Sequence, residues 1–480
     1  MDTETRPLTL GGGIGDADAG SPGQVEAGVL ERLASPEAIA SLIGGDPTPT
    51  TPIDWQPPGD GGQATLPPAP PEPESLRRAG LSDADVESLA LKTLLHTGMC
   101  SGGDVASHIC LPRKLTGDVL DRLREELLIS IKSSAGVHDY VYQLTDAGFQ
   151  RARRLAEQCN YAGSAPVPLA AYDTAIRRQS IRSATFRIAD LHRTLLDMTL
   201  SAGLLSQFAQ AINDGRGMFL YGSPGNGKTT LAERISGAFG QHVWIPRMSG
   251  IGGDLVRLYD PSCHERVEAP QLKTLKHDRR WVLIKRPTVV VGGELTLEQL
   301  DASYNPATGI SEAPVQLKAN GGTLLIDDFG RQRASSTDIL NRLIVPLEKQ
   351  FDFLNLASGR QIQTPFELLF ILSTNLEPRH LVDEAFLRRI PYKIEVQNPT
   401  EEQFRTLFTK LTQQMGYTLH ADALDLLIQE HYAAADRPLR FCHPRDLLRQ
   451  VKNYCEVHEL PTEVSPDTLS VAVRNYFAGL

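Results

Sequence analysis

The stretch from Gly222 to Thr230 reads GSPGNGKTT, and it decides the fold expected for this chain. It fits the pattern G-x-x-x-x-G-K-[ST]. An apolar and aromatic run, residues 218–221, precedes it, and a segment of helix-forming composition, residues 230–235, follows it. A short buried strand, a glycine loop and a helix in this order place backbone N–H groups and the positive end of the helix dipole around one point. The sequence therefore predicts a phosphate-binding loop.

Each position of this loop has an expected part in holding a nucleotide. The glycines allow the backbone to wrap around the β- and γ-phosphates, Lys228 can reach phosphate oxygens, and Thr229 can ligate Mg²⁺. The residues expected to contact the nucleotide are Gly222, Ser223, Pro224, Gly225, Asn226, Gly227, Lys228, Thr229 and Thr230.

Two further apolar runs end in polar residues that belong at the same site. Residues 323–326 read TLLI and lead into Asp327-Asp328, and residues 368–372 read LLFIL and lead to Asn375. A carboxylate at the C-terminal end of a buried parallel strand lies beside a phosphate loop and can hold Mg²⁺ through water. We expect Asp327 to serve the metal and Asp328 to orient the attacking water. Asn375 is expected to touch the γ-phosphate or to align that water.

Composition describes an ordinary globular protein. The chain has 480 residues, 41% apolar and 22% charged, which is enough for two or three domains. Its net charge of −10 argues against a protein that mainly coats nucleic acid. No run approaches the ~18 apolar residues of a membrane span, and the N-terminal residues lack the pattern of a signal peptide. Six scattered cysteines form no C-x-x-C pair. We therefore expect a cytoplasmic protein without membrane insertion.

The chain divides into five expected segments. Residues 1–75 are rich in Gly, Pro, Ala, Asp and Thr and are expected to be a disordered tail. Residues 76–160 read as a compact domain, and residues 161–185, which contain two prolines, read as a linker. Residues 186–398 alternate strands with helices, which predicts a parallel sheet. Residues 399–480 are helical in pattern throughout.

The pattern of residues 76–160 resembles a winged helix-turn-helix. Its helix candidates are residues 83–96, 103–109, 117–127 and 146–158, and its strand candidates are residues 129–132 and 139–144. DNA contact is one reading of such a domain. Between residues 81 and 160, however, nine basic and eleven acidic residues give a net charge of −2. Because DNA affinity comes largely from phosphate neutralisation, this charge favours a protein-docking or packing module.

The series of motifs from Gly222 to Arg449 resembles the AAA+ ATPases. The resemblance implies an αβα nucleotide domain with a parallel sheet, followed by an all-helical lid, and it implies ATP with Mg²⁺ as the ligand. It also implies assembly into a ring, often a hexamer, in which an arginine finger enters the neighbour's site. It matches Lys228 and Thr229 to Walker A, Asp327 and Asp328 to Walker B, Asn375 to sensor 1, Arg388 or Arg389 to the finger, and Arg445 to sensor 2.

Two details narrow the resemblance. The run KANGGTLLIDD and a hairpin expected at residues 356–375 are similar to the MoxR-like ATPases, and the first of these also to the enhancer-dependent transcription activators. The arrangement of about residues 160–480 is similar to bacterial ATPases predicted to have chaperone activity and linked to Flp pilus assembly. One residue departs from many members, because Asp328 stands where Glu is common and its carboxylate reaches about 1.5 Å less. Either the backbone shifts to compensate or hydrolysis is slow.

The long interval between Lys228 and Asp327 contains RWVLIKRPTVVV at residues 280–291. Two strand-like runs broken by Pro287 read as an inserted hairpin. Such a hairpin either lies near a ring's pore, where Tyr259 and Trp281 would grip a client, or packs on an edge of the core.

These observations favour a ring-forming ATPase that remodels a protein client or complex. The alternative is a DNA-associated ATPase, a regulator or loader, that uses residues 76–160 on duplex DNA. A nucleotide-binding switch with negligible turnover is a third reading.

Overall fold

The computed structural model describes residues 66–478 except 184–186, 196–197, 199, 269 and 383. Most of the expected tail, residues 1–65, lies outside the described residues. The rest of that expected tail packs on the folded part of the chain, because Pro67 O accepts a hydrogen bond from Trp244 Nε1 at 3.1 Å and Pro70 O accepts one from the Asp278 amide at 2.9 Å. The assignment of residues 66–75 to the tail is thus corrected.

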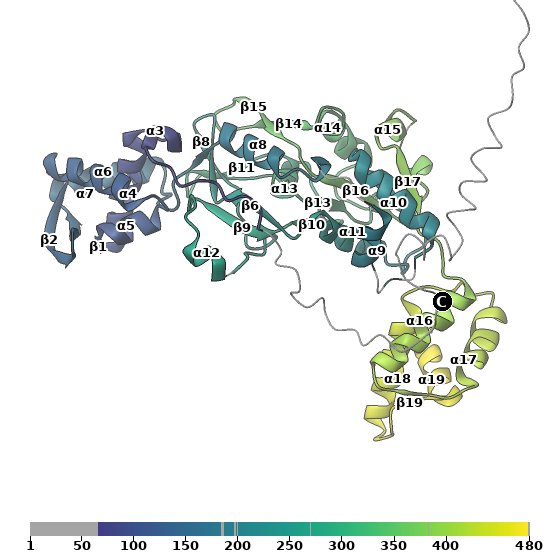
Figure 1. Ribbon diagram of the computed structural model, residues 1–480. Helices are drawn as coiled ribbons and strands as arrows, with labels where there is room; N and C mark the ends of the chain where they lie inside the picture. The colour runs from purple at the N-terminus through teal and green to yellow at the C-terminus, as the bar shows by residue number, and fades with distance from the viewer. Residues whose placement is uncertain are drawn as a thin grey trace, which may run out of the picture. The chain divides into compact units, whose positions relative to one another are not determined.

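Residues 76–158 form helices around a small antiparallel sheet (Figure 1). The elements are α3 (Leu76–Ala79), α4 (Asp83–Thr97), β1 (Met99–Ser101), α5 (Gly102–His108), α6 (Arg113–Glu125), β2 (Ile129–Gly136), β3 (Asp139–Leu144) and α7 (Asp146–Gln158). The strand order is β1-β3-β2. Capping boxes at Ser82 and Ser101 begin α4 and α5, which explains why these helices start where the sequence predicts. The predicted helices and hairpin are confirmed, and the three-residue strand β1 was too short to predict.

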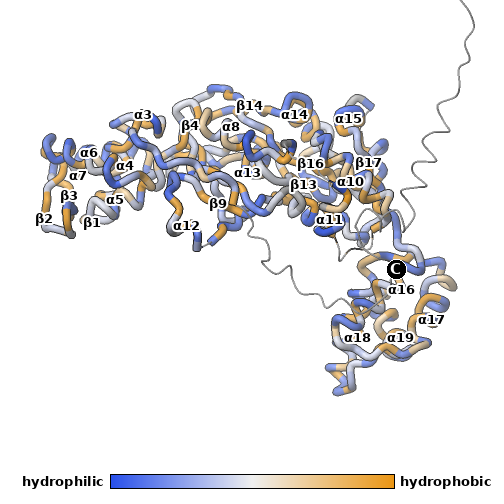
Figure 2. The backbone as a smooth tube through the Cα atoms, viewed as in Figure 1, coloured by the Kyte–Doolittle hydropathy of each residue, from blue (hydrophilic) through white to orange (hydrophobic). Residues whose placement is uncertain are grey.

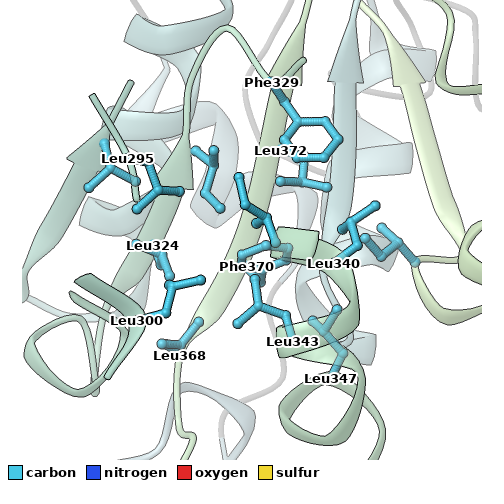
Figure 3. Packing of buried hydrophobic residues seen from close by; sticks show 14 of the residues in the cluster. Leu295, Leu300, Leu324, Phe329, Leu340, Leu343, Leu347, Leu368, Phe370 and Leu372 are labelled. Carbon is cyan, nitrogen blue, oxygen red and sulfur yellow. The ribbon is translucent and has the colours of Figure 1, made fainter. Parts of the chain in front are cut away.

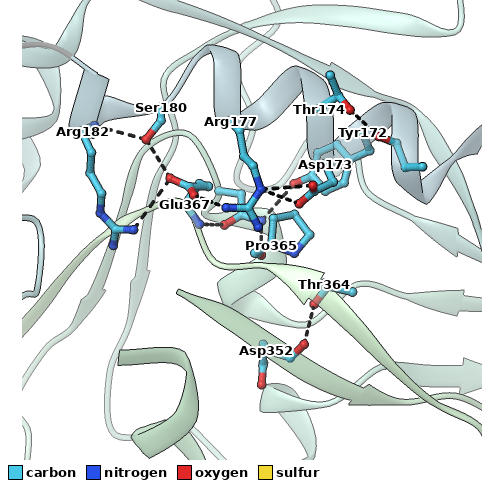
Figure 4. Close-up of polar contacts among 12 residues, drawn as sticks. Tyr172, Asp173, Thr174, Arg177, Ser180, Arg182, Asp352, Thr364, Pro365 and Glu367 are labelled. Atoms are coloured by element: carbon cyan, nitrogen blue, oxygen red, sulfur yellow. Dashed lines mark hydrogen bonds and ion pairs between the residues drawn. The ribbon is translucent and has the colours of Figure 1, made fainter. Parts of the chain in front are cut away.

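The expected linker, residues 161–185, is folded instead over much of its length. It contains β4 (Val167–Pro168) and α8 (Leu169–Arg178), and Tyr172 and Ile176 of α8 are buried in the core. The prolines do not break this helix, because Pro168 occupies its N-cap position. Figure 4 shows how the buried Glu367 accepts hydrogen bonds from Arg177 NH1 at 3.0 Å and from Ser180 Oγ at 2.7 Å. The residues around Glu367 are thereby fixed to the segment that the sequence assigned to a linker.

The central sheet has five parallel strands in the order β10-β13-β16-β5-β17. They are β5 (Met218–Tyr221), β10 (Thr288–Val291), β13 (Thr323–Ile326), β16 (Leu369–Thr374) and β17 (Tyr392–Glu395). The first strand along the chain, β5, lies between the fourth and the fifth. The predicted parallel sheet is confirmed, and this reversal of strand order at β5 is where open α/β sheets bind ligands.

Helices cover both faces of this sheet, because alternate strand residues point to opposite sides. Leu325 and Ile371 pack toward α10 (Ala202–Asp214) and α11 (Lys228–Ile235) in one buried cluster. Leu324 and Phe370 pack in a second cluster with α14 (Ser336–Lys349), as Figure 3 shows. Figure 2 shows the hydrophobic character of β13 and β16. The fold is therefore an αβα layer structure, as predicted.

The remaining strands before residue 399 form a second, mixed sheet and two antiparallel pairs. The mixed sheet has the order β11-β12-β8-β7-β4 and adds β7 (Met248–Ile251), β8 (Asp254–Arg257), β11 (Ser303–Asn305) and β12 (Ile310–Glu312). The pairs are β6 (His242–Pro246) with β9 (Trp281–Lys285), and β14 (Phe351–Asn355) with β15 (Gln361–Pro365). A hairpin does precede Asn375, but it is the β14–β15 pair, which begins upstream of the expected residues 356–375, and the strand that leads to Asn375 belongs to the central sheet.

The inserted hairpin expected at residues 280–291 is absent. Strand β9 pairs antiparallel with β6, whereas β10, on the other side of Pro287, pairs parallel with β13 in the central sheet. Trp281 is 4% exposed and packs in the core, so it cannot grip a client, and Tyr259 packs partly buried against the same cluster. Both runs are apolar because both become buried strands, each with a different partner.

Residues 399–478 form a largely helical segment with its own core. Its elements are α16 (Glu401–Gln414), β18 (Thr418–Leu419), α17 (Ala423–Leu426), the π-helix η5 (Leu427–Ala433), α18 (His443–Val457), β19 (Glu463–Val464) and α19 (Pro466–Tyr476). The helical C-terminal part is confirmed. The expectation that it is helical throughout is corrected in one detail, because β18 and β19 pair in parallel. Nowhere in the described part of the chain is there a helix with the length and apolarity to cross a membrane.

Candidate nucleotide-binding site

The predicted phosphate loop connects the end of β5 to the start of α11. Gly225 and Gly227 adopt φ angles of 81° and 77°, the left-handed region that glycine enters without strain. Gly227 is the N-cap residue of α11 and carries no side chain that could cap it. The amides of the first helical turn, together with the helix dipole, therefore favour an anion at this point.

Lys228 lies at the centre of the loop and is 7% exposed. Its Nζ donates hydrogen bonds to Gly222 O at 2.8 Å, to Ser223 O at 3.1 Å and to Asn375 Oδ1 at 2.7 Å. Burial lowers the pKa of the Lys228 ammonium, although the charges of Asp327 and Asp328 oppose that shift. The loop and Asn375 thus hold the ammonium group in one position.

A hydroxyl and a carboxylate meet beside the lysine. Thr229 Oγ1 donates a hydrogen bond to Asp327 Oδ2 at 2.6 Å, across 98 residues of sequence. Oxygen ligands of this kind suit a hard cation such as Mg²⁺, which is usually bound by one or two protein oxygens plus phosphates and waters. The donor set therefore fits the predicted metal.

Asp328 adopts a left-handed backbone conformation with φ of 47°. Its Oδ1 accepts a hydrogen bond from Asn375 Nδ2 at 3.2 Å, and its backbone N–H donates to Asp327 Oδ1 at 3.0 Å. Gln332 Nε2 donates to the Asp327 carbonyl at 2.8 Å. A non-glycine residue in this region persists only where its surroundings hold it, and such strain gathers at functional sites.

The loops after β13 and β16 are tied together. The Phe329 amide donates to Ser373 O at 2.7 Å, and Thr374 Oγ1 donates to Phe329 O at 3.0 Å. These bonds set the distance between Asp328 and Asn375. The structure therefore brings together Lys228, Thr229, Asp327, Asp328 and Asn375, as the sequence predicts.

These residues line a cavity of about 790 Å³. This volume lies within the range of small-molecule and cofactor sites. Loop residues Pro224 to Thr230 line it, whereas Gly222 and Ser223 take part through the carbonyls that hold Lys228. Its apolar lining residues are Met198, Leu200, Leu204, Leu231, Val396, Leu407, Leu411 and Phe441. The cavity thus joins a polar end, suited to phosphates, to apolar surface suited to a base and sugar.

Arg445 also lines this cavity, from the first turn of α18. Its Nε lies 3.6 Å from Asp446 Oδ1. The helical C-terminal segment contacts the loop directly, because the Cys442 amide donates to Gly225 O at 2.9 Å. A residue separated from the loop by more than 200 positions in sequence is therefore placed at the same site.

Arg388 and Arg389 do not line the cavity. They end the helix α15 (Glu384–Arg389). The Arg388 side chain is 77% exposed and pairs with Glu384 on the same helix. The Arg389 side chain is 28% exposed, pairs with Glu348 of α14 at 2.6 Å and lies over the Phe386 ring.

Several lining residues were not predicted from the sequence. They are Arg331, Gln397, Asn398, Gln403, Phe441 and Cys442. Arg331 and Asn398 belong to no sequence motif. The only signals in the sequence are that Arg331 lies close to Asp328 and that Asn398 follows β17. Phe441 and Cys442 directly precede the helix that carries Arg445, and this position is the one sequence signal that could have predicted them as site residues.

Comparisons with known proteins add little at the level of function. A family model described as a domain of unknown function (DUF8689) matches residues 400–475. A search of curated proteins found no match. Among solved structures, NtrX from Brucella abortus is 14% identical and is similar over 59% of this chain and 57% of its own length, with a TM-score of 0.38. The chain thus spans little more than half the length of NtrX.

Two other solved structures are similar to a comparable degree. RuvB from Thermotoga maritima, described as a Holliday junction branch migration motor, is 13% identical over 57% of this chain and 68% of its own, with a TM-score of 0.32. The complex between subunits BchI and BchD of magnesium chelatase gives 17% identity over 57% of this chain and 91% of that one, with a TM-score of 0.31. With TM-scores this low, these likenesses carry no weight in the proposal below.

Proposed function

We propose that this chain is an ATPase of the AAA+ type that binds ATP with Mg²⁺ and hydrolyses it. The observation that carries the proposal is a continuous hydrogen-bonded series, Lys228 to Asn375 to Asp328, at the carboxyl edge of a parallel sheet. It lies beside the Thr229–Asp327 pair, in a cavity large enough for a nucleotide. Each group has a defined task in phosphoryl transfer to water.

The residues divide the chemistry among them. Lys228 and the first amides of α11 bind phosphate oxygens and stabilise the charge that develops as the bond to the γ-phosphorus breaks. Asp328 accepts a hydrogen bond from the attacking water and orients its oxygen toward that phosphorus. Asn375 holds both Lys228 and Asp328 in place. Thr229 and Asp327 would hold Mg²⁺, which supplies further charge neutralisation when bound.

The left-handed backbone at Asp328 supports hydrolysis over a switch without turnover. Its carboxylate is shorter than the glutamate common in similar proteins, and a misplacement of ~1 Å can slow a reaction around 10²-fold. The φ angle of 47° and the bond from Asn375 re-aim this shorter side chain. We therefore propose that backbone geometry compensates for the missing methylene.

Assembly into a ring, with a hexamer as the expected form, would complete this site. Of the two candidate fingers, we propose Arg388, because its guanidinium is largely exposed and paired only within its own helix among the contacts described for it. Arg389 is engaged by Glu348 and Phe386 of the same subunit. An arginine supplied by a neighbour can contribute roughly 10³–10⁵ in rate, so the isolated subunit would turn over slowly.

We further propose that turnover remodels a protein client or complex in the cytoplasm, in a chaperone-like manner, with secretion or pilus assembly as a candidate setting. Its support is that the helical segment carrying Arg445 contacts the phosphate loop through Cys442 and Gly225. A change in phosphate state at the loop can therefore move a separate helical segment, which is how such proteins turn binding into mechanical work.

The test of the proposed function compares wild type with Lys228→Ala. Wild type should bind ATP and release phosphate in the presence of Mg²⁺. The Lys228→Ala variant should lose at least about 100-fold in ATP affinity, since it removes charge-assisted bonds to phosphate. Titration calorimetry and a phosphate-release assay measure both, with Lys452→Ala on the exposed face of α18 as the matched control. Failure of wild type to bind any adenine nucleotide at millimolar concentration would exclude the proposal.

A second candidate function is that of a DNA-associated regulator or loader. It is supported by the helices α4, α5 and α6 followed by the β2–β3 hairpin. Against it, α6 carries Asp118 and Asp121 on its exposed side, and Arg113 pairs with Asp139. If the full chain bound duplex DNA through this domain, its affinity should fall by about 10³-fold between 50 and 200 mM salt. We expect no such binding, and a fluorescence-anisotropy titration decides.

A further inference from the structure

Asn226, within the phosphate loop, is buried to 3% exposure although it is polar and lies in a loop. Its Nδ2 donates to Asn398 Oδ1 at 2.8 Å and approaches Val396 O at 3.4 Å. Its Oδ1 faces the Phe441 amide at 3.5 Å. One side chain therefore reaches the connection between β17 and α16 and also the residues just before α18.

The surroundings of Asn226 strengthen this contact. Asn398 Oδ1 accepts a second hydrogen bond, from Arg440 NH1 at 3.1 Å. The neighbouring Gly225 packs so closely on the helical segment that an added Cβ would lie 2.5 Å from Cys442 Sγ. Gly225 and Asn226 thus contact two parts of the chain. One is the connection between β17 and α16, and the other is the stretch just before α18.

The chemistry of an amide is what this position uses. The Asn226 NH₂ group faces two acceptors and its carbonyl faces one donor. Aspartate would have the same shape but would offer no donor to Val396 O and Asn398 Oδ1, and alanine would reach none of the three. Because the group is buried, a lost partner is not replaced freely by water.

We propose that Asn226 is a positioning residue that transmits the state of the nucleotide phosphates to the helical segment through Asn398. The inference rests on the proposed function, because it names the route by which the nucleotide site would move α16 and α18. The loop amides beside Asn226 receive the phosphates, so any shift of the loop displaces its side chain. Asn398 and the Phe441 amide then move with it, and with α18 moves Arg445 at the cavity.

The test uses Asn226→Ala, Asn398→Ala and the double variant in the full chain. Asn453→Ala, an exposed position on α18 away from the cavity, is the matched control. Each single variant should lower kcat about fivefold to tenfold, a larger factor than its loss of affinity for a non-hydrolysable ATP analogue. The double variant should lose less than the product of the two single losses, because both single variants remove the bond between Asn226 and Asn398.

A second readout separates coupling from a general loss of structure. In wild type, the analogue should slow amide hydrogen exchange in residues 399–457, and in both alanine variants it should bind without that protection. Asn398→Asp, which keeps an acceptor oxygen for Asn226 and Arg440, should turn over faster than Asn398→Ala.

The outcomes are distinguishable. Multiplicative losses in the double variant, or protection of residues 399–457 equal to wild type, would overturn the coupling while leaving the ATPase proposal intact. A parallel loss of analogue affinity and turnover would show that Asn226 only supports the loop, and would also overturn it. Absence of binding and turnover in wild type itself would instead sink the proposed function.

Discussion

Asp328 is the residue on which the chemistry of this site depends most. It lies two residues after the last residue of the buried strand β13, so its backbone has little freedom to move, yet it adopts the left-handed conformation. Asn375, Gln332 and the Asp327 carboxylate together hold it there. Because three groups support the strained backbone of Asp328, the direction of its side chain is set by the structure and matters for the chemistry of the site.

We expect Asp328→Asn to bind ATP about as tightly as wild type and to hydrolyse it at least about 100-fold more slowly, because it keeps the shape but loses the charge that orients water. Asp328→Glu should also be slower than wild type, since its longer side chain overshoots the position that the backbone sets. Single-turnover phosphate release, measured beside ATP affinity, checks both. A faster Asp328→Glu enzyme would contradict the proposed compensation by the backbone.

At the scale of elements, the π-helix η5 contacts the start of α18. Its residue Tyr432 places its hydroxyl 2.9 Å from Nδ1 of His443, which begins α18, and both rings pack on Phe477. Arg437 stacks over the same Phe477 ring at 3.8 Å. Short π-helical insertions are frequent at functional sites. Here Tyr432 of the π-helix supports the start of the helix that carries Arg445.

Acid should weaken this part of the molecule through His443. Burial, with the charge of Arg440, lowers the pKa of His443 from 6.5 to about 4. Above pH 6.5 the imidazole is neutral in both the folded and the unfolded chain. Between pH 6.5 and 4 only the unfolded chain takes up the proton, so stability falls as pH falls, by at most about 3 kcal/mol.

Chemical unfolding of wild type and His443→Asn at pH 7 and pH 4 measures this effect. The asparagine keeps an acceptor for the Tyr432 hydroxyl but cannot take up a proton in this range. Wild type should therefore lose up to about 3 kcal/mol more stability than the variant between the two pH values. Equal losses in the two proteins would show that His443 does not titrate between them.

At the scale of the whole molecule, buried polar contacts join residues 76–160 to the layers behind the site. Arg280, 3% exposed, pairs with Asp278 at 2.7 Å and donates to Ala79 O and Pro166 O. Arg279 donates to Leu111 O at 2.9 Å. The small domain is thus held against the core by buried hydrogen bonds as well as by its chain connection. A partner that binds this domain would therefore also pull on the mixed sheet.

The assembly proposal predicts complementation between two inactive variants. Arg388→Ala keeps its own site but lacks the finger, and Asp328→Asn keeps the finger but lacks the group that orients water. In a mixed ring, about a quarter of the interfaces would combine an intact site with an intact finger. Mixing should therefore restore measurable phosphate release, which neither variant shows alone.

Arg389→Ala is the control for this experiment. It should keep most of the wild-type activity, and mixing it with Asp328→Asn should give no more activity than Arg389→Ala shows alone. If Arg389→Ala were inactive and complemented Asp328→Asn while Arg388→Ala remained active, the two arginines would exchange roles. If neither mixture regained activity, a finger supplied by a neighbour would be excluded for both residues.

Much of the site follows from short stretches of sequence. The glycine loop, Lys228 and Thr229 lie within one strand–loop–helix unit, and Asp327 and Asn375 each end an apolar strand. Local rules of this kind need no partner to be known, because a phosphate loop and the carboxyl end of a parallel strand have a set geometry. The helices with capping boxes could be predicted for the same reason.

Other features depend on which distant segments meet, and no local pattern contains that information. The apolar runs of β9 and β10 read equally well as two strands of one hairpin, and only the burial available beside β6 and beside β13 separates them. The sequence of residues 161–178 predicts a linker, and only the contacts with Glu367 in the structure show that this segment is folded. Asn226 and Asn398 are 172 residues apart. Their meeting is set by how the helical segment packs on the loop, because long-range packing, unlike a turn or a cap, is a property of the complete chain.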